Sequence, residues 1–245
     1  MFIVQVGAGG TGNWYARALA HSLMESYKDN PIDIDWTLVD PDVVEARNLI
    51  RQPFYGGINV NKADYLASLI RNLFKQVQYP EGKSIVYRRE LLINEIEDLE
   101  KQISLPTEIL ILVSCVDNTY TRQVMEKFLA RHKGSLEKAI YVNMGVTEEG
   151  AWISEVAGLN KFLPTTYKDD EITLPDELMS CAEREERGPV PQTTYSNIMA
   201  GTTAAQLTME ALRSEHINNY LKVVSGGNLK AVVHPEWHYY TDRMT

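Results

Sequence analysis

An α/β fold with a doubly wound, mainly parallel sheet is predicted by three features of this 245-residue sequence. Short apolar runs at residues 1–6, 34–39 and 108–114 alternate with segments whose apolar residues recur every three or four positions, the spacing of a helix packed on a sheet. The run at 108–114 is apolar on both faces, which is typical of a central parallel strand. A glycine-rich turn links the first run to the first helical segment, so the chain opens with a β-α-β unit.

The other elements follow from the same patterns. Helices are predicted at residues 13–27, 62–74, 91–101, 119–132 and 193–213, and further strands at 84–87, 138–143, 152–156, 221–224 and 229–233. The strand at 152–156 leaves the parallel order, so antiparallel strands are expected near the C-terminus. We therefore predict a Rossmann-like sheet with helices on both faces.

Length and hydrophobic content indicate one folding unit. With 245 residues and 44% hydrophobic content, the chain can bury a full core, and we expect a single domain over residues 1–245. Residues from about 158 to 191 are irregular, proline-containing and rich in acids, and they predict a crossover-like loop over the site.

Charge and composition exclude several classes of protein. A formal net charge of −9 argues against a nucleic-acid surface, which needs clustered Lys and Arg. No run approaches the roughly 18 to 20 apolar residues of a membrane span, and no export signal is present, so a cytoplasmic protein is expected. Two cysteines without a CxxC pair support neither a disulfide framework nor a structural zinc site.

The glycine-rich turn is the first candidate ligand site. Gly7, Gly9, Gly10 and Gly12 permit a tight turn and a close backbone approach, and a phosphate is favoured at the start of the following helix. The alternative is a sharp strand-to-helix turn without a ligand. Asp40, at the end of the second strand, is placed to bind ribose hydroxyls, which leaves both NAD and ATP as candidates.

A second cluster of polar residues favours ATP over NAD. Asn48, Arg51, Gln52 and Lys62 place cations and amides beside Asp40, and a cleaved triphosphate needs such groups more than a dinucleotide does. Exposed charges on a loop and a helix face are the alternative interpretation. Asp117 follows the central strand, where it would lie at the carboxyl edge near the glycine turn and hold Mg²⁺.

Together these residues resemble a known family. The pattern Asp40-x-Asp42-x5-Asn48-x2-Arg51-Gln52, followed by Lys62 and then Asp117-Asn118-x3-Arg122, is similar to the ThiF/MoeB and ubiquitin-activating adenylyltransferases, with Gly7-x-Gly9-Gly10-x-Gly12 as their nucleotide loop. The compact chain most resembles the bacterial PRTRC-type ThiF branch. The paired CxxC zinc motifs of many relatives are absent, and no arginine-bearing helix precedes the first strand.

The resemblance implies an enzyme that uses ATP and Mg²⁺ to adenylate the C-terminal glycine of a small ubiquitin-like β-grasp protein, and it implies a homodimer. It assigns ribose binding to Asp40 and phosphate contacts to Asn48, Arg51, Gln52 and Lys62. Asp117 would hold the magnesium, and Asp42 and Asn118 would complete the nucleotide site. Arg51, Lys62 and Asp117 are the candidate catalytic groups of this step.

Cys181 is the candidate residue for a second step, because relatives carry a cysteine between the sheet and a late helix that accepts the acyl group or takes part in sulfur transfer. The nearby acids Glu183, Glu185 and Glu186 would raise its pKa, so a structural or incidental thiol is the alternative. Cys115, at a strand end, is expected to be an ordinary buried thiol.

Two further functions remain open. One is a scaffold of this family that holds the nucleotide or the β-grasp partner without turnover. The other, which is weaker, is an NAD-dependent oxidoreductase. The segment from His234 to His238 lacks a fourth ligand and is expected to be packing rather than a metal site.

Overall fold

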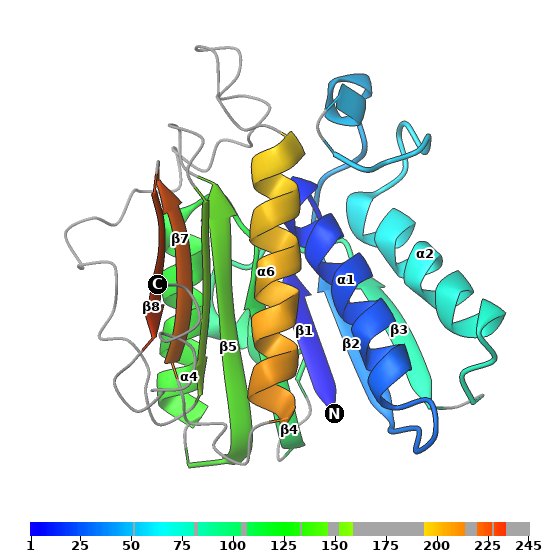
Figure 1. The fold of residues 1–245 in the computed structure, drawn as a ribbon. Helices are drawn as coiled ribbons and strands as arrows, with labels where there is room; N and C mark the ends of the chain where they lie inside the picture. The colour runs from blue at the N-terminus through cyan, green and yellow to red at the C-terminus, as the bar shows by residue number, and fades with distance from the viewer. Residues whose placement is uncertain are drawn as a thin grey trace.

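The computed structural model describes residues 1–50, 52–80, 83–103, 107–132, 134–146, 152–158, 194–213, 220–226 and 228–233. Within them lies an eight-stranded sheet of order β3-β2-β1-β4-β5-β6-β7-β8 (Figure 1). Its strands are β1 Phe2–Val6, β2 Ile34–Val39, β3 Ser84–Arg89, β4 Thr107–Ser114, β5 Leu136–Val146, β6 Trp152–Gly158, β7 Tyr220–Gly226 and β8 Asn228–Val233. The helices are α1 Gly10–Ser26, the 3-10 turn η1 Ala46–Ile50, α2 Lys62–Gln76, α3 Ile96–Glu100, α4 Thr119–His132 and α6 Thr194–Arg213.

The first five strands run parallel, and the last three are added antiparallel. The chain winds from β1 outward through β2 to β3, then returns to place β4 on the other side of β1. The winding direction therefore reverses between β1 and β4, and open α/β sheets bind ligands outside the carboxyl ends of the strands at such a reversal. The fold class predicted from the sequence is confirmed.

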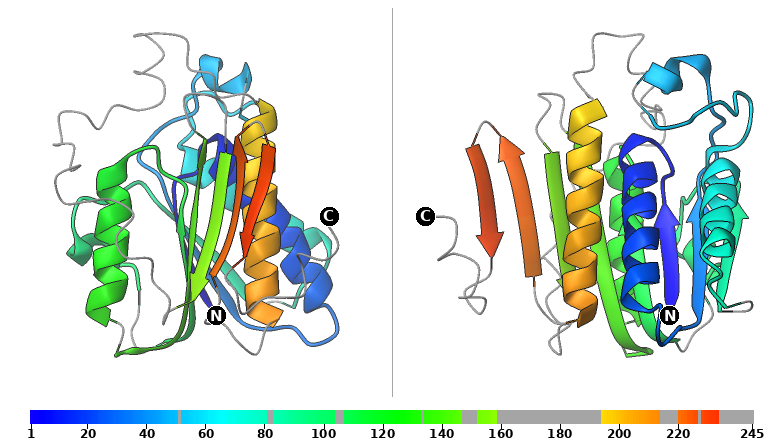
Figure 2. Two further views of the ribbon diagram at one scale, coloured as in Figure 1. Left: turned by 60° about the vertical axis from the view of Figure 1, so that its left-hand side comes forward. Right: turned by 45° about the vertical axis from the view of Figure 1, so that its right-hand side comes forward.

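Helices cover both faces of the sheet. In Figure 1, α1, α2 and α6 lie in front of it and α4 lies behind, and the two views of Figure 2 show the same layers from the side. The front layer packs on one buried cluster that includes Trp36, Ile111 and Val142. The rear layer of α3 and α4 packs on a second cluster around Leu112 and Phe128. The sheet is therefore buried on both faces at its centre, as its continuous apolar strands predict.

Helices α1 and α6 pack closely because a glycine lies at their crossing. A Cβ added at Gly201 would lie 2.6 Å from the Thr11 carbonyl oxygen and 2.7 Å from the Tyr15 nitrogen, so no larger residue fits without moving backbone. Thr11 Oγ1 also donates to Asn197 Oδ1 of α6 at 2.8 Å. This contact fixes the late helix against the beginning of α1, beside the glycine turn.

Most element bounds agree with the predictions within a few residues, but two helices differ. Helix α1 begins at Gly10 and not at Asn13, so Gly10 and Gly12 lie in its first turn. The helix predicted at 91–101 is wrong in length, since α3 is only Ile96–Glu100. Asp98 accepts hydrogen bonds from the backbone N–H groups of Asn94 and Glu95, and this cap starts the helix later than its apolar spacing suggests.

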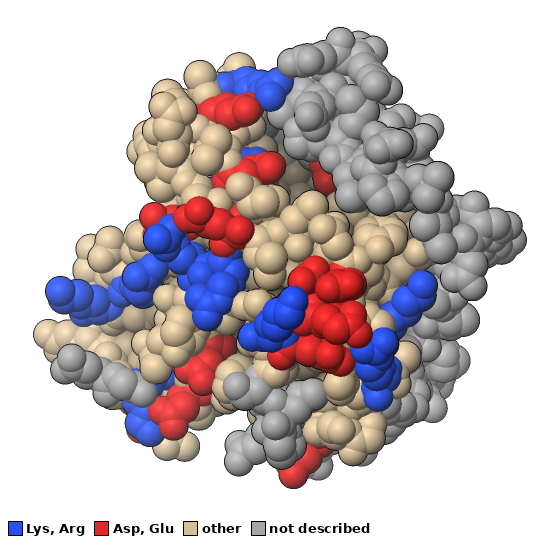
Figure 3. Space-filling model, turned by 180° about the vertical axis from the view of Figure 1, so that it is seen from behind, with Lys and Arg blue, Asp and Glu red and all other residues tan. Residues whose placement is uncertain are grey.

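The face seen from behind carries acidic and basic side chains intermingled rather than segregated into a basic patch (Figure 3). Among the described helices, none is long and apolar enough to span a bilayer. The described residues also contain no group of three or more His, Cys, Asp or Glu side chains arranged to hold a metal ion.

Candidate nucleotide site

The glycine turn is shaped by close backbone packing at two of its four glycines. Gly7 has a φ of +99°, and a Cβ there would lie 2.7 Å from the Cys115 carbonyl oxygen. At Gly12 a Cβ would lie 2.3 Å from the Gly7 carbonyl oxygen. Gly9 differs, because a Cβ there would meet no atom within 4 Å. The turn is therefore tightly packed at Gly7 and Gly12 and open at Gly9. It precedes a 17-residue helix, and the first backbone N–H groups of a helix have no partner within it and can bind an anion.

Gln5 holds this turn from below. Its side chain is fully buried in β1, and Nε2 donates to the carbonyl oxygens of Gly7 and Gly12, both at 2.9 Å. Gln5 is not among the site residues predicted from the sequence. The available signal was an amide inside an otherwise apolar strand, immediately before the turn.

Asp40 lies at the carboxyl end of β2, almost fully buried beside the turn. Its Oδ2 accepts the Ala8 N–H at 2.7 Å, and its Oδ1 accepts the Asp42 N–H at 2.9 Å. Burial raises the pKa of Asp40 from 3.8 to about 6, although Lys62 and the Ala8 N–H oppose the rise. The carboxylate is thus tied to the glycine turn, where an acid can receive ribose hydroxyls.

Lys62 begins α2 and is paired with Asp42. Its Nζ donates to Asp42 Oδ2 at 2.7 Å, and the lysine is buried whereas the Asp42 carboxylate is half-exposed. Asn61, which caps α2, donates from Nδ2 to the carbonyl oxygens of both Asp40 and Asp42. The start of α2 is therefore fastened to the segment after β2, and Asp42 positions the Lys62 ammonium. Asn61 was also missed, although an amide directly before a helix is a recognisable cap.

Asn48 and Gln52 lie on the segment that follows. Asn48 is buried, and its Oδ1 accepts the Glu45 N–H at 2.9 Å, so it stabilises η1 from within. The Gln52 N–H donates to the Asn48 carbonyl oxygen at 2.8 Å, and the Gln52 side-chain Oε1 is buried without a hydrogen-bond partner. Arg51 lies outside the residues that the structure describes.

The third part of the site comes from the loop between β4 and α4. Asp117 is partly exposed at the carboxyl edge, one strand away from the glycine turn. Asn118 Oδ1 accepts the Thr121 N–H at 2.7 Å and so caps α4. Arg122, which is buried, donates to the carbonyl oxygens of Val116 and Met144 and to the Asn143 side chain, which fixes this loop to the end of β5.

The two cysteines differ in what the structure describes. Cys115 is a partly buried free thiol packed beneath Gly7, and burial raises its pKa strongly, which favours the packing role expected from the sequence over a catalytic one. Cys181 and most of the loop predicted at 158–191 lie outside the described residues, as does the segment from His234 to His238.

The arrangement can hold a nucleotide. An anion-binding turn that is open at Gly9, a buried carboxylate at Asp40 and a lysine at the start of α2 meet along one edge of the sheet. Three buried amide atoms in this region, Gln5 Oε1, Asn13 Nδ2 and Gln52 Oε1, have no hydrogen-bond partner among the described residues, and such atoms cost about 1–3 kcal/mol each unless a ligand or water satisfies them. Asn13, like Gln5, is not among the site residues predicted from the sequence.

The chain is similar in sequence to one protein family and in fold to several solved structures. A model of the ThiF family matches residues 1–223. Among curated proteins, none matches this sequence. The fold is similar to the crystal structure of E. coli MccB with succinimide, at 19% identity and a TM-score of 0.59 over 95% of this chain and 63% of that one.

Two further solved structures have comparable values. E. coli MccB with ATP is 19% identical with a TM-score of 0.57, over 95% of this chain and 62% of that chain. Selenomethionine PaaA is 18% identical with a TM-score of 0.55, over 95% of this chain and 63% of that chain. This chain therefore spans a little under two thirds of the length of these proteins, and at such identities the likeness shows a shared fold.

Proposed function

From the premise that the chain belongs to the ThiF family, we propose that it is an ATP-dependent adenylyltransferase acting on the C-terminal carboxylate of a small protein or peptide. The observation that carries the proposal is the meeting of the open glycine turn, Asp40 and Lys62 at one edge of the sheet. Solved structures of MccB with ATP, and with the peptide MccA, support the choice of ATP and of a peptide-like substrate.

The proposed reaction needs positioning and charge stabilisation more than acid–base chemistry. A carboxylate oxygen of the substrate forms a bond to the α-phosphorus, the bond from that phosphorus to the bridging oxygen breaks, and pyrophosphate leaves. Because the nucleophile is already an anion, no side chain has to remove a proton. A site without a general base can therefore carry out this step.

Each part of the site then has a task. Asp40 receives the ribose hydroxyls, and the N-terminus of α1 receives phosphate oxygens above Gly9. Lys62, which Asp42 holds in place, offsets the charge on the departing pyrophosphate, with Arg51 and Gln52 as further phosphate contacts.

Magnesium is the metal that this donor set fits. Asp117 is one partly exposed carboxylate at the carboxyl edge, and Mg²⁺ binds through one or two carboxylates together with phosphate oxygens and water. Asp117 would hold the ion, which would supply charge neutralisation at the phosphates.

More specifically, we propose a ubiquitin-like β-grasp protein ending in glycine as the substrate and a homodimer as the working assembly. A thioester or sulfur-transfer step at Cys181 would follow the adenylate. The family resemblance supports all three. Replacement of Cys181 by Ala should abolish any reductant-sensitive adduct and leave adenylation intact; an adduct that persists in the variant would rule out this cysteine.

The test of the main proposal is ATP–pyrophosphate exchange in the presence of Mg²⁺ and candidate proteins or peptides with a free C-terminal carboxylate. Lys62→Ala should lower exchange at least 100-fold, while Lys75→Ala, in the last turn of the same helix, should leave it unchanged. ATP binding without exchange for any candidate would instead indicate a non-catalytic scaffold, and tighter binding of NAD than of ATP would indicate the oxidoreductase alternative.

A further inference from the structure

Arg17 joins helix α1 to the segment that follows η1. It lies one turn after Asn13 and donates from Nε to Asn13 Oδ1 at 2.6 Å. Its Nη2 donates to the Pro53 carbonyl oxygen at 2.9 Å, and the guanidinium carbon lies 5.5 Å from the centre of the Tyr55 ring. One side chain thus makes three contacts that bridge two parts of the chain far apart in sequence.

The segment held by Arg17 carries Gln52, the residue directly before Pro53. Gln52 is fixed on its N-terminal side by the hydrogen bond from its N–H to the Asn48 carbonyl oxygen. On the C-terminal side, the Tyr55 N–H donates to the hydroxyl of Tyr65 on α2 at 2.9 Å. Arg17 supplies the connection to α1, whose first turn is the candidate phosphate-binding end.

The contacts of Arg17 depend on the shape of a guanidinium rather than on an ion pair. Among the described residues, no carboxylate forms a salt bridge with Arg17, although such pairs are recorded for Arg47, Arg88 and Arg131. Its Nε donates to the Asn13 side-chain amide and its Nη2 donates to the Pro53 backbone carbonyl. The guanidinium also lies over the Tyr55 ring. A lysine has one charged nitrogen and cannot reproduce this geometry.

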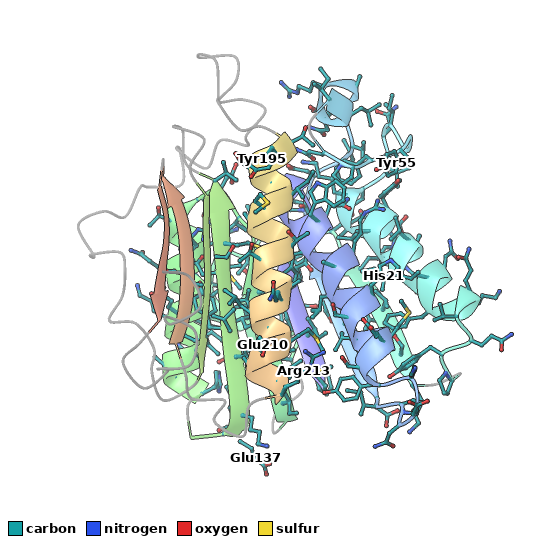
Figure 4. The ribbon with its side chains drawn as sticks, viewed as in Figure 1. His21, Tyr55, Glu137, Tyr195, Glu210 and Arg213 are labelled. Atoms are coloured by element: carbon teal, nitrogen blue, oxygen red, sulfur yellow. The ribbon has the colours of Figure 1, made fainter. Side chains whose placement is uncertain are left out.

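Two buried amide atoms lie beside this bridge. Arg17 donates to the oxygen of the Asn13 amide, while the nitrogen of that amide, Nδ2, is buried without a partner, and so is Gln52 Oε1 on the held segment. The packing of the described residues does not satisfy these two atoms, so a ligand or water beside Gln52 would find hydrogen-bonding groups already in place. Figure 4 shows Tyr55 in the loop above α1 and α2, at the end of the molecule where this segment lies.

We infer that Arg17 is a positioning residue that holds the Gln52 segment in its nucleotide-binding arrangement. The inference rests on the proposed binding of ATP. Arg17 acts through Gln52 and does not touch the nucleotide itself. Arg17 also lines a groove of about 820 Å³ between α1 and α2. The space left by a shorter side chain would therefore be open to solvent, and no sealed cavity would form.

The test is a double-mutant cycle on ATP binding, measured by calorimetry with the full chain and Mg²⁺. Arg17→Ala and Arg17→Lys should each weaken ATP binding about tenfold. The same substitutions made in a Gln52→Ala background should weaken it less than twofold, because the group that Arg17 positions is then absent. Arg71→Ala is the matched control and should change nothing, because Arg71 is exposed and its guanidinium donates to the Ala67 carbonyl oxygen within α2.

The outcomes separate this inference from the proposed function. If the wild-type chain binds no ATP, the proposed function fails. If the wild type binds ATP but the losses from Arg17→Ala and Gln52→Ala are additive, Arg17 does not act through Gln52 and the inference is overturned. Full affinity in Arg17→Lys would show that only the charge matters and would overturn it too. Thermal melts of all variants, expected within a few degrees of wild type, exclude unfolding as the cause.

Discussion

Asp40 should make the stability of this protein depend on pH in a defined window, and Asp40→Asn should remove that dependence. The pKa of Asp40 is about 6 in the fold against an ordinary value of 3.8, because burial disfavours the charged form. Below pH 3.8 the carboxyl is neutral in both the folded and the unfolded chain, so its contribution is greatest there. As the pH rises to about 6, the unfolded chain ionises first, and stability is lost. Two pKa units correspond to about 3 kcal/mol.

The assay is urea unfolding of the wild type and Asp40→Asn at intervals from pH 4 to pH 7.5, with the difference in unfolding free energy taken at each pH. The difference should shift by about 2 kcal/mol in favour of the variant between pH 4 and about pH 6.5 and change little above about pH 7, because part of the full effect is already lost at pH 4. Asp35→Asn, on the same strand, controls for the loss of one carboxylate. A difference that stays flat across the range would refute the assignment of a raised pKa to Asp40.

The remaining predictions concern glycines and a helix cap. Gly12→Ala should lower the melting temperature and abolish ATP binding, because the new Cβ would lie 2.3 Å from the Gly7 carbonyl oxygen. Gly9→Ala should leave unfolding within about 0.5 kcal/mol of wild type, yet weaken ATP binding at least tenfold in calorimetry, because its Cβ fills only the open space above the turn. Gly201→Ala should cost about 1–3 kcal/mol in urea unfolding through the crossing of α1 and α6; an unchanged midpoint would contradict that close packing. Asn118→Ala should cost about 1 kcal/mol for the lost α4 cap, and Asn118→Asp should restore most of it.

Much of the fold follows from local patterns in the sequence. The helix α4 and the strand β2 have the predicted bounds, because apolar spacing and flanking polar residues mark both ends. The sequence placed Asp40 at the end of β2 and Asp117 after β4, and the parallel order then brings both to one edge. Local pattern failed at α3, where the side chain of Asp98 stops the helix from extending backward.

The residues of the candidate site also fall into those that sequence patterns predict and those that they do not. The glycine turn, Asp40 and Lys62 could be found from spacing, because a phosphate and a ribose require those residue types in that order. Gln5 and Arg17 were not predicted, because an amide in an apolar strand is a weak signal for Gln5, and Arg17 contacts the Pro53 carbonyl oxygen, which lies 36 residues away in sequence. Polar residues of this kind have no spacing signature of their own.

The alternation of strands and helices, the nucleotide turn and the family resemblance can be predicted from the sequence, because they depend on periodicity and on residues close along the chain. Folding sets how these parts are held in register. It paired Lys62 with Asp42, raised the pKa of Asp40 by burial and bridged α1 to the Gln52 segment through Arg17. Those features arise from distances between residues and from exclusion of water, and neither quantity exists until the sheet and its helices have packed.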